Sequence, residues 1–429
     1  MTATCGEPVH KRRLIRAGGL LDAAGTEVAP GVVLVESDRV AAAGTPESIG
    51  SVPDAEIVDR TGELLVPGLV NAHCHLDLSG PGPWPPAGGD YRGWVGRVRS
   101  LRAEASEAQV RRAVRRGIAL SLAGGTSCIG DIAGEPPAAS IEELRRSPLQ
   151  GTAFVECFGI GSGQPSSIER MLGQLSGCPA DEAGVRVGVS PHAPYSCGPD
   201  VFAAAASTGR QLSTHLAETK GEADLLLLGS GPLREMLEKD IGVWNEGVRI
   251  PWGTETGMPR AASPVARVVA AMSGTGALCA HMNYLGHDDV DCCVAAGIRL
   301  VYCPRASASF GHAPPAVDPH PWLALREAGL TVCLGTDSLL CLDTPERISV
   351  LDDMRLLYRR DGVDPMILLE MATIAGADAL EIPRAAVSLG PSVAGLVAVR
   401  SSATTPVGML ANALAHDGPP SWAVQPTSL

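Results

Sequence analysis

The chain has 429 residues, of which 45% are hydrophobic and 19% charged, a composition typical of a globular protein with one large core and a smaller satellite domain. Its net charge of −13 argues against a nucleic-acid-binding surface, because contact with phosphates needs clustered lysine and arginine. No apolar run reaches the ~18 residues that a membrane-spanning helix needs, and Met1–Arg13 is not followed by the apolar region of a signal peptide. Twelve cysteines are scattered without the spacing of a disulfide framework, which indicates reduced thiols. We therefore expect a cytoplasmic protein that binds neither nucleic acid nor membranes.

The two ends of the chain have the pattern of short strands. Within residues 1–66, Gly31–Val35 and Arg39–Ala43 are apolar runs separated by turn-forming residues, a pattern typical of β structure. Residues 387–429 contain a similar run, Gly395–Val399. We expect the two terminal segments to form one small β-sandwich domain.

Residues 67–386 have a different pattern, in which short apolar strands alternate with helical stretches such as Gly221–Lys239. This alternation is the signal for parallel βα units, and eight of them predict an α/β protein with a (β/α)8 TIM barrel. Two segments rich in glycine and proline, Gly80–Gly89 and Gly247–Pro264, are expected insertions over the active-site face. The eight predicted strands are Leu69–His73, Ser127–Ile132, Thr152–Gly159, Val185–Val189, Leu212–His215, Ala277–His281, Leu300–Cys303 and Thr331–Gly335.

Histidines and an aspartate end several of these strands. His73 and His75 are two residues apart, so a strand would point both side chains to the same side, where they could chelate one ion. Alone, this pair is a weak signal. His215, His281 and Asp337 end the fifth, sixth and eighth strands, and in a barrel the catalytic residues come from the ends of several strands. Imidazoles with a carboxylate suit a divalent metal, Zn²⁺ first and Fe²⁺ second.

Two longer motifs carry a family resemblance. Residues 66–75, VPGLVNAHCH, and residues 192–196, HAPYS, resemble the amidohydrolase superfamily, in particular its mononuclear deaminase branch. That branch includes deaminases of adenosine-type thioethers and aminofutalosine, and chlorohydrolase-like proteins are similar. The resemblance implies metal binding by His73, His75, His215 and Asp337. It also implies substrate contact by His192 and proton transfer by Glu218 and His281.

The family resemblance also bears on the number of metal ions. Its binuclear members bridge two ions with a lysine near the end of the fourth strand. Here that strand ends in Val189–His192, and none of the three lysines, Lys11, Lys220 and Lys239, is near it. We therefore expect one metal ion, with Glu156 on the third strand as a less favoured bridging carboxylate.

Further residues are candidates for substrate binding. Trp94 follows the first insertion and could cover the site, although tryptophan more often serves packing. Glu104 is the only candidate for the ribose-binding glutamate of related deaminases, and its surroundings match poorly. Arg305 lies in the loop after the seventh strand, and Ser338 follows Asp337. Asp131, at the end of the second strand, is expected to be a structural hydrogen-bond acceptor.

The predicted reaction is hydrolytic deamination of an amino-heterocycle, purine-like or nucleoside-like, by a metal-activated water. Asp337 would accept a proton from the water, His281 would orient it, and Glu218 would protonate a ring nitrogen and then the leaving ammonia. Dechlorination of a triazine or opening of a cyclic amide is the alternative on the same scaffold. A non-catalytic scaffold is a remote alternative, because no ligand is missing. The expected partner is a small-molecule substrate, and a homodimer is possible.

Overall fold

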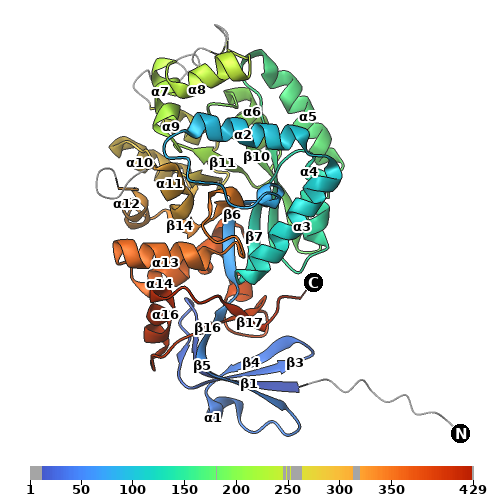
Figure 1. The fold of residues 1–429 in the computed structure, drawn as a ribbon, viewed down its shortest axis with the longest axis vertical. Coiled ribbons are helices and arrows are strands. Elements are labelled where there is room, and N and C mark those ends of the chain that lie inside the picture. The colour runs from blue at the N-terminus through green and yellow to red at the C-terminus, as the bar shows by residue number, and fades with distance from the viewer. Residues whose placement is uncertain are drawn as a thin grey trace, which may run out of the picture.

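The structure, a computed structural model, has helices and strands alternating through the middle of the chain, in an α/β fold (Figure 1). Most of the predicted insertion at residues 247–264 lies outside the described residues. Within the described part of the chain, no helix is long and apolar enough to cross a membrane. The structure describes residues 12–179, 181–244, 248, 252, 263–312 and 319–427.

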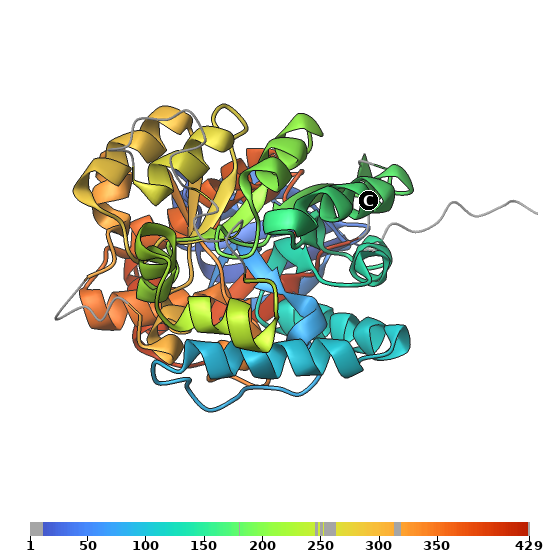
Figure 2. The ribbon, with the colours of Figure 1, turned by 90° about the horizontal axis from the view of Figure 1, so that it is seen from above.

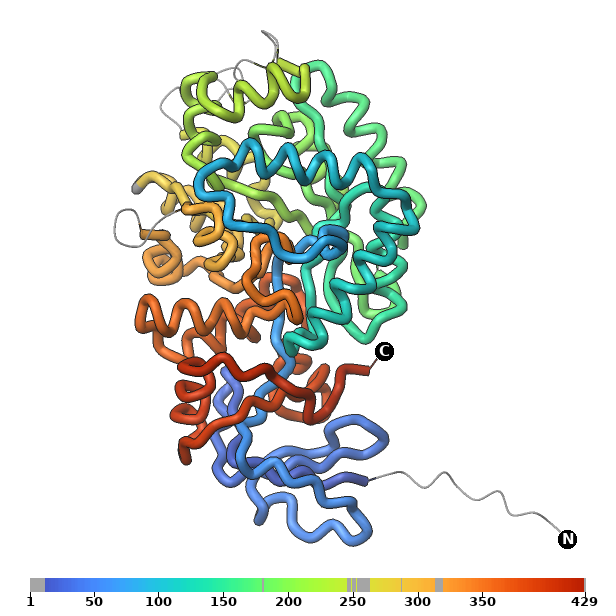
Figure 3. Tube along the Cα trace, viewed as in Figure 1, coloured from blue at the N-terminus to red at the C-terminus, as the bar shows by residue number. Residues whose placement is uncertain are grey.

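Both ends of the chain contribute to one seven-stranded sheet. Its strands are β1 (Arg12–Leu21), β2 (Glu27–Val28), β3 (Gly31–Glu36), β4 (Arg39–Gly44), β5 (Glu56–Pro67), β16 (Leu396–Arg400) and β17 (Ser421–Val424). They follow the order β17-β16-β5-β1-β3-β4, with β2 paired to β1. β5 is parallel to β1 and antiparallel to β16, so the two terminal segments join there. This sheet has a hydrophobic core of its own, which includes Ile15, Val33, Val40, Leu65, Leu396 and Val424. In the Cα trace, the C-terminal segment (red) lies next to the N-terminal strands (blue) at this end of the molecule (Figure 3).

Each of the eight strands predicted for the middle of the chain overlaps a strand of the structure. These strands are β6 (Leu69–His75), β7 (Thr126–Ala133), β8 (Gln150–Cys157), β10 (Val185–Pro191), β11 (Ser213–Leu216), β12 (Leu278–His281), β13 (Arg299–Tyr302) and β14 (Thr331–Leu334). Two short strands, β9 (Asp181–Glu182) and β15 (Asp337–Ser338), extend them. β6 and β7 are buried along their whole length, as expected for parallel strands covered on both faces.

These strands form two sheets that meet at two edges, and all of them are parallel except β9, which is antiparallel to β10. The orders are β15-β6-β7-β8-β10-β9 and β11-β12-β13-β14. At one edge Val189 of β10 forms a parallel bridge with Leu212. At the other edge the Thr336 N–H donates to the His73 carbonyl at 3.0 Å, and β15 pairs with β6. The carboxyl ends of the parallel strands therefore lie at the same end of the fold.

Helices connect the strands. They are α2 (Tyr91–Glu104), α3 (Glu107–Ala123), α4 (Pro137–Arg145), α5 (Gln164–Ser176), α6 (Pro199–Ser207), α7 (Lys220–Leu228), α8 (Pro232–Glu235), α9 (Pro264–Ala271), α10 (His287–Ala296), α11 (Pro304–Phe310), α12 (Trp322–Glu327), α13 (Val350–Asp361), α14 (Pro365–Met371) and α15 (Ile374–Ala379). Two others, α1 (Pro46–Ile49) and α16 (Pro406–Ala415), belong to the terminal segments. The prediction of one helix over Gly221–Lys239 was wrong. Gly229 ends α7 in a left-handed conformation with φ of 62°, and α8 starts anew at Pro232.

Helix α2 lies beside the segment that follows α7 (Figure 2). Arg92 of α2 forms ion pairs of 2.7 Å with both Glu235 and Asp240. Asp90 caps the start of α2 by accepting a hydrogen bond from the Gly93 N–H. These contacts fix the first turn of α2, which carries two aromatic residues of the candidate site.

Candidate active site

Four residues from three parts of the sequence meet at the carboxyl ends of the strands. His73 and His75 belong to β6, His215 to β11 and Asp337 to β15. The Nε2 atoms of His75 and His215 are 3.3 Å apart, and His75 Nε2 is 3.6 Å from Asp337 Oδ1. Ring nitrogens of the three histidines all lie within 4.8 Å of one another. This spacing allows all four side chains to reach one ion.

The protonation of these histidines fits a metal site. Burial lowers the pKa of His73 and of His75 well below the usual value, so both imidazoles are neutral and each has one unprotonated ring nitrogen. Among the described residues, neither ring nitrogen of His73 has a hydrogen-bond partner. His215 Nδ1 is 2.8 Å from the His192 carbonyl oxygen, so Nδ1 carries the proton and the Nε2 lone pair faces His75. Nitrogen donors with one carboxylate suit a divalent metal ion.

Two residues at the strand ends have strained backbones. Asp337 and His281 have φ angles of 60° and 75°, in the left-handed region that residues other than glycine rarely adopt. Such a conformation costs about 1–3 kcal/mol and persists only where the surroundings hold it, most often at active sites. Asn71 provides part of this support, because its side chain hydrogen-bonds the hydroxyl and the N–H of Thr336 at 2.8 and 3.1 Å.

Glu218 is buried next to His281. Its Oε1 is 3.8 Å from His281 Nε2, and its Oε2 accepts a 2.7 Å hydrogen bond from the Tyr91 hydroxyl. The Tyr91 hydroxyl is also 3.1 Å from that of Tyr195. Burial raises the pKa of Glu218 to about 7, so this carboxyl group can hold or release a proton near neutral pH. The Glu222 carboxylate fixes the turn by accepting the backbone N–H groups of Ala217 and Glu218.

The two tyrosines were not assigned a role from the sequence. Tyr195 lies within the HAPYS motif, and its place in this motif could have identified it as a candidate site residue. Tyr91 gave none, because it contacts Glu218 across 127 positions of the chain. Only the placement of α2 brings the Tyr91 hydroxyl to the carboxyl group.

A cavity of about 1190 Å³ opens over this cluster. Of the predicted site residues, it is lined by His75, Trp94, His192, His215, Glu218, His281 and Asp337. Trp94 packs edge-on against Phe310, with ring centroids 4.8 Å apart, so its ring forms part of the wall. Apolar side chains such as Leu78, Val98, Ile160 and Met236 line the same cavity.

Three predicted substrate-binding residues do not line this cavity. Glu104 is the exposed last residue of α2. Ser338 is buried beneath the site, where its N–H donates to Asp337 Oδ1 at 2.6 Å and its hydroxyl is 3.4 Å from Cys341 Sγ. Asp131 is the predicted structural acceptor, and its Oδ1 accepts from the Leu76 N–H at 2.9 Å.

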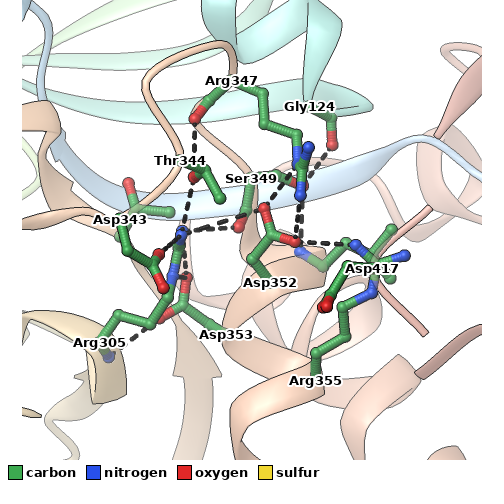
Figure 4. A network of polar contacts seen from close by, with 12 residues as sticks. Gly124, Arg305, Asp343, Thr344, Arg347, Ser349, Asp352, Asp353, Arg355 and Asp417 are labelled. Carbon is green, nitrogen blue, oxygen red and sulfur yellow. Dashed lines mark hydrogen bonds and ion pairs between the residues drawn. The ribbon is translucent and has the colours of Figure 1, made fainter. Parts of the chain in front are cut away.

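Arg305 is the third predicted substrate-binding residue that does not line the cavity. It belongs to a buried polar network (Figure 4). Its guanidinium group is 2.9 Å from Asp353 Oδ2 and donates to the Ser349 carbonyl at 2.9 Å. It also donates to Asp343 and Thr344 at 3.2 and 3.0 Å. The structure therefore places Arg305 where it ties α11 to α13, with its side chain only 6% exposed, rather than over the histidine cluster.

Arg305→Met should test the role of this network. The change leaves the fully buried Asp353 without its charged partner, and breaking a buried ion pair costs about 3–5 kcal/mol. We expect a lower thermal unfolding temperature, measured by calorimetry, with an unchanged KM for any substrate that is turned over. A raised KM at an unchanged unfolding temperature would instead support the substrate contact predicted from the sequence.

An α/β scaffold with histidines and an aspartate gathered at the strand ends is typical of metal-dependent hydrolases. The model of the Amidohydrolase family matches residues 64–389, and the chain belongs to this family. It is therefore an enzyme.

The chain is also similar to individual proteins in sequence or in fold. The chain is 27% identical over 388 residues to the aminodeoxyfutalosine deaminase of Deinococcus radiodurans, which covers 85% of this chain and 84% of that protein. The crystal structure of Helicobacter pylori aminofutalosine deaminase with methylthio-coformycin is similar in fold, with a TM-score of 0.74, 17% identity, and coverage of 95% of this chain and 97% of that one. A mutant atrazine chlorohydrolase of Arthrobacter aurescens, complexed with zinc and atraton, gives a TM-score of 0.71, 19% identity, and coverage of 96% and 95%.

Proposed function

We propose that this enzyme hydrolytically deaminates an amino-heterocycle, either a purine or a nucleoside-like compound. The observation that carries the proposal is the buried carboxyl group of Glu218, whose pKa is raised to about 7 and which lies between Tyr91 and His281. A deaminase needs such a group to protonate a ring nitrogen. The relatives named as deaminases support the same reaction.

The proposed metal site consists of His73, His75, His215 and Asp337, and the ion is one Zn²⁺, with Fe²⁺ as the second choice. A bound divalent metal supplies a Lewis acid that makes water a stronger nucleophile at neutral pH. Glu156 does not serve as a bridging ligand in this proposal, because Arg102 pairs with its Oε2 at 2.7 Å and its carboxylate groups with His192 and His215 rather than with His73 and His75. The zinc complex of the chlorohydrolase neighbour supports the choice of ion.

The side chains then divide the proton transfers. His281 orients the attacking water, and Asp337, whose pKa burial raises to about 7, accepts a proton from it. Glu218 gives its proton to the ring nitrogen next to the reacting carbon. It then takes up the hydroxyl proton left on that carbon and passes it to the amino group, which leaves as ammonia as the carbonyl forms, and the proton held by Asp337 returns to Glu218 for the next turnover. His192 and Trp94 contact the substrate from the cavity wall.

An ammonia-release screen tests this proposal. The zinc-loaded enzyme is offered adenosine-type nucleosides, guanine, cytosine and melamine, and we expect ammonia from at least one nucleoside or purine. Release of chloride from a chlorotriazine, with no ammonia from any amine, would favour the chlorohydrolase alternative that the structural neighbour suggests. If the metal-loaded protein releases neither ammonia nor chloride, the proposal is overturned.

Tyr91→Phe should lower kcat roughly 10-fold, the cost of one lost hydrogen bond to a charged group. The hydrogen bond from Tyr91 lowers the pKa of Glu218, so its loss raises that pKa. The limb of the pH–rate profile that reports Glu218 should therefore move to higher pH. Tyr358→Phe, on α13, is the matched control and should change neither value. An unchanged profile in Tyr91→Phe would show that Tyr91 does not position Glu218.

We also propose the finer architecture expected from the sequence. The contacts at both edges of the two parallel sheets support a closed (β/α)8 barrel over residues 67–386. The hydrophobic core shared by β4 and β17, the two ends of the terminal sheet, supports a small β-sandwich of residues 1–66 and 387–429. All eleven described cysteines are free, which supports a cytoplasmic location. A homodimer that acts on a small molecule remains the predicted state.

A further inference from the structure

Glu156 has a buried carboxylate oxygen that the proposed reaction does not use. The residue lies near the carboxyl end of β8, its side chain is 1% exposed, and it lines the main cavity. Arg102 donates to Oε2 at 2.7 Å. Among the described residues, Oε1 has no hydrogen-bond partner. A buried carboxylate oxygen without a donor is costly, which indicates that a ligand supplies the donor.

His192 places a second acceptor next to this oxygen. Its Nδ1 is 2.7 Å from the Ser196 hydroxyl oxygen, which is also 3.1 Å from the Ala193 carbonyl oxygen. In the tautomer in which the hydroxyl donates to this carbonyl, the neutral imidazole donates from Nδ1 and its Nε2 is an acceptor. His192 Nε2 and Glu156 Oε1 are 4.0 Å apart. Two acceptors at this distance favour a ligand group that donates to both.

The local charge also favours a donor. Arg102 lies between two carboxylates, since its Nε is 2.9 Å from Asp77 Oδ2 while Nη1 is 2.7 Å from Glu156. One positive charge thus faces two negative charges. Glu156, His192 and His215 lie close enough together to hold a metal ion. A second metal ion is nevertheless a poor occupant, because His215 donates from Nδ1 to the His192 carbonyl and turns its Nε2 toward His75.

A row of three imidazole rings separates Glu156 from Glu218, where the reaction is proposed to take place. The rings of His192 and His215 have centroids 4.8 Å apart, and those of His215 and His281 are 5.3 Å apart. Glu156 is next to the first ring of this row, and Glu218 is next to the last. A substrate with its amino group near Glu218 can therefore reach Glu156 along this row of rings.

We propose that Glu156 and His192 form a specificity subsite for a substrate group with two hydrogen-bond donors, such as a vicinal diol or an amine. This proposal rests on the proposed deaminase function, because it takes the reacting amino group to lie at Glu218. The half-exposed ring of Phe158, 4.7 Å from that of His192, forms an apolar wall beside the subsite.

Binding measurements test the subsite separately from turnover. The zinc-loaded Glu218→Gln enzyme, which should bind but not react, is titrated by calorimetry with adenosine, 3′-amino-3′-deoxyadenosine and 2′,3′-dideoxyadenosine. We expect one of the two donor-bearing compounds to bind roughly 10–100-fold more tightly than the dideoxy compound. Tighter binding of adenosine identifies the diol, and tighter binding of the amino compound identifies the amine.

Adding Glu156→Gln should abolish this preference. Arg102 requires an acceptor, so the glutamine oxygen faces Arg102 and the amide NH₂ takes the place of Oε1, turning an acceptor into a donor. Glu135→Gln is the matched control, because Glu135 is an exposed carboxylate that lines the same cavity, and it should keep the preference. Equal affinities for the three compounds, no binding of any of them, or a preference that survives Glu156→Gln would overturn the subsite. Absence of ammonia release by the wild-type enzyme would instead overturn the deaminase function.

Discussion

Glu218→Gln is expected to lower kcat by roughly 10²–10⁴-fold, the usual contribution of a general acid–base residue. Glutamine has the same shape and can still accept the 2.7 Å hydrogen bond from Tyr91, so the cavity should keep its form. The amide cannot take up or release a proton in the neutral pH range, and both proton transfers to nitrogen are lost. Steady-state ammonia release measures the effect, and metal analysis of the purified variant should give the wild-type content.

The metal content separates the possible roles of Glu218. Loss of the metal together with activity would show that Glu218 is a ligand and that its proposed role is wrong. Glu135→Gln makes the same chemical change at the cavity mouth and should retain wild-type kcat. A Glu218→Gln enzyme with nearly full activity would leave the deaminase proposal without its acid.

His215→Ala is expected to remove the metal and, with it, the activity. His215 lies between His75 and His192, so its loss takes away one of four donors. Loss of an outer hydrogen-bonding partner already weakens metal binding roughly 10–100-fold, and loss of a direct donor should exceed this. Zinc titration with a competing chelator measures the affinity, and calorimetry should show a lower unfolding temperature because bound metal stabilises the folded state.

His416→Ala is the control for this experiment. His416 is exposed, and its Nδ1 contacts only the Asn412 carbonyl among the partners described. It should retain metal, activity and stability. Wild-type zinc affinity in His215→Ala would rule out His215 as a ligand, whatever happens to the activity.

Much of the candidate site follows from local sequence patterns. The period of two along a strand puts His73 and His75 on one side, and parallel strands bring their carboxyl ends to one end of the fold. Both rules depend only on backbone geometry, so the strand ends at His215, His281 and Asp337 could be recognised without a structure. In the structure His75, His215, His281 and Asp337 line one cavity, and His73 is buried beside His75.

Other residues depended on contacts that no local pattern encodes. Arg305 follows the seventh strand as a site residue would, yet its side chain turns to Asp353 on α13 and to the carbonyl of Ser349, which caps the start of that helix. Glu104 stands at a plausible distance after Trp94, yet the helical turn leaves it exposed at the end of α2. In both cases the direction of the side chain depends on which surface the helix packs against.

The sequence by itself determined the eight parallel strands, the histidines and the aspartate at their ends, and the family, because these follow from periodicity and from contiguous motifs. Only the tertiary structure decided what surrounds Glu218 and Glu156. Tyr91 reaches Glu218 because α2 is held across the cavity, and Arg102 from the same helix occupies one oxygen of Glu156 and leaves the other facing the cavity. The physical reason is that burial and hydrogen-bond partners, which set proton affinity and specificity, come from segments far apart in the chain.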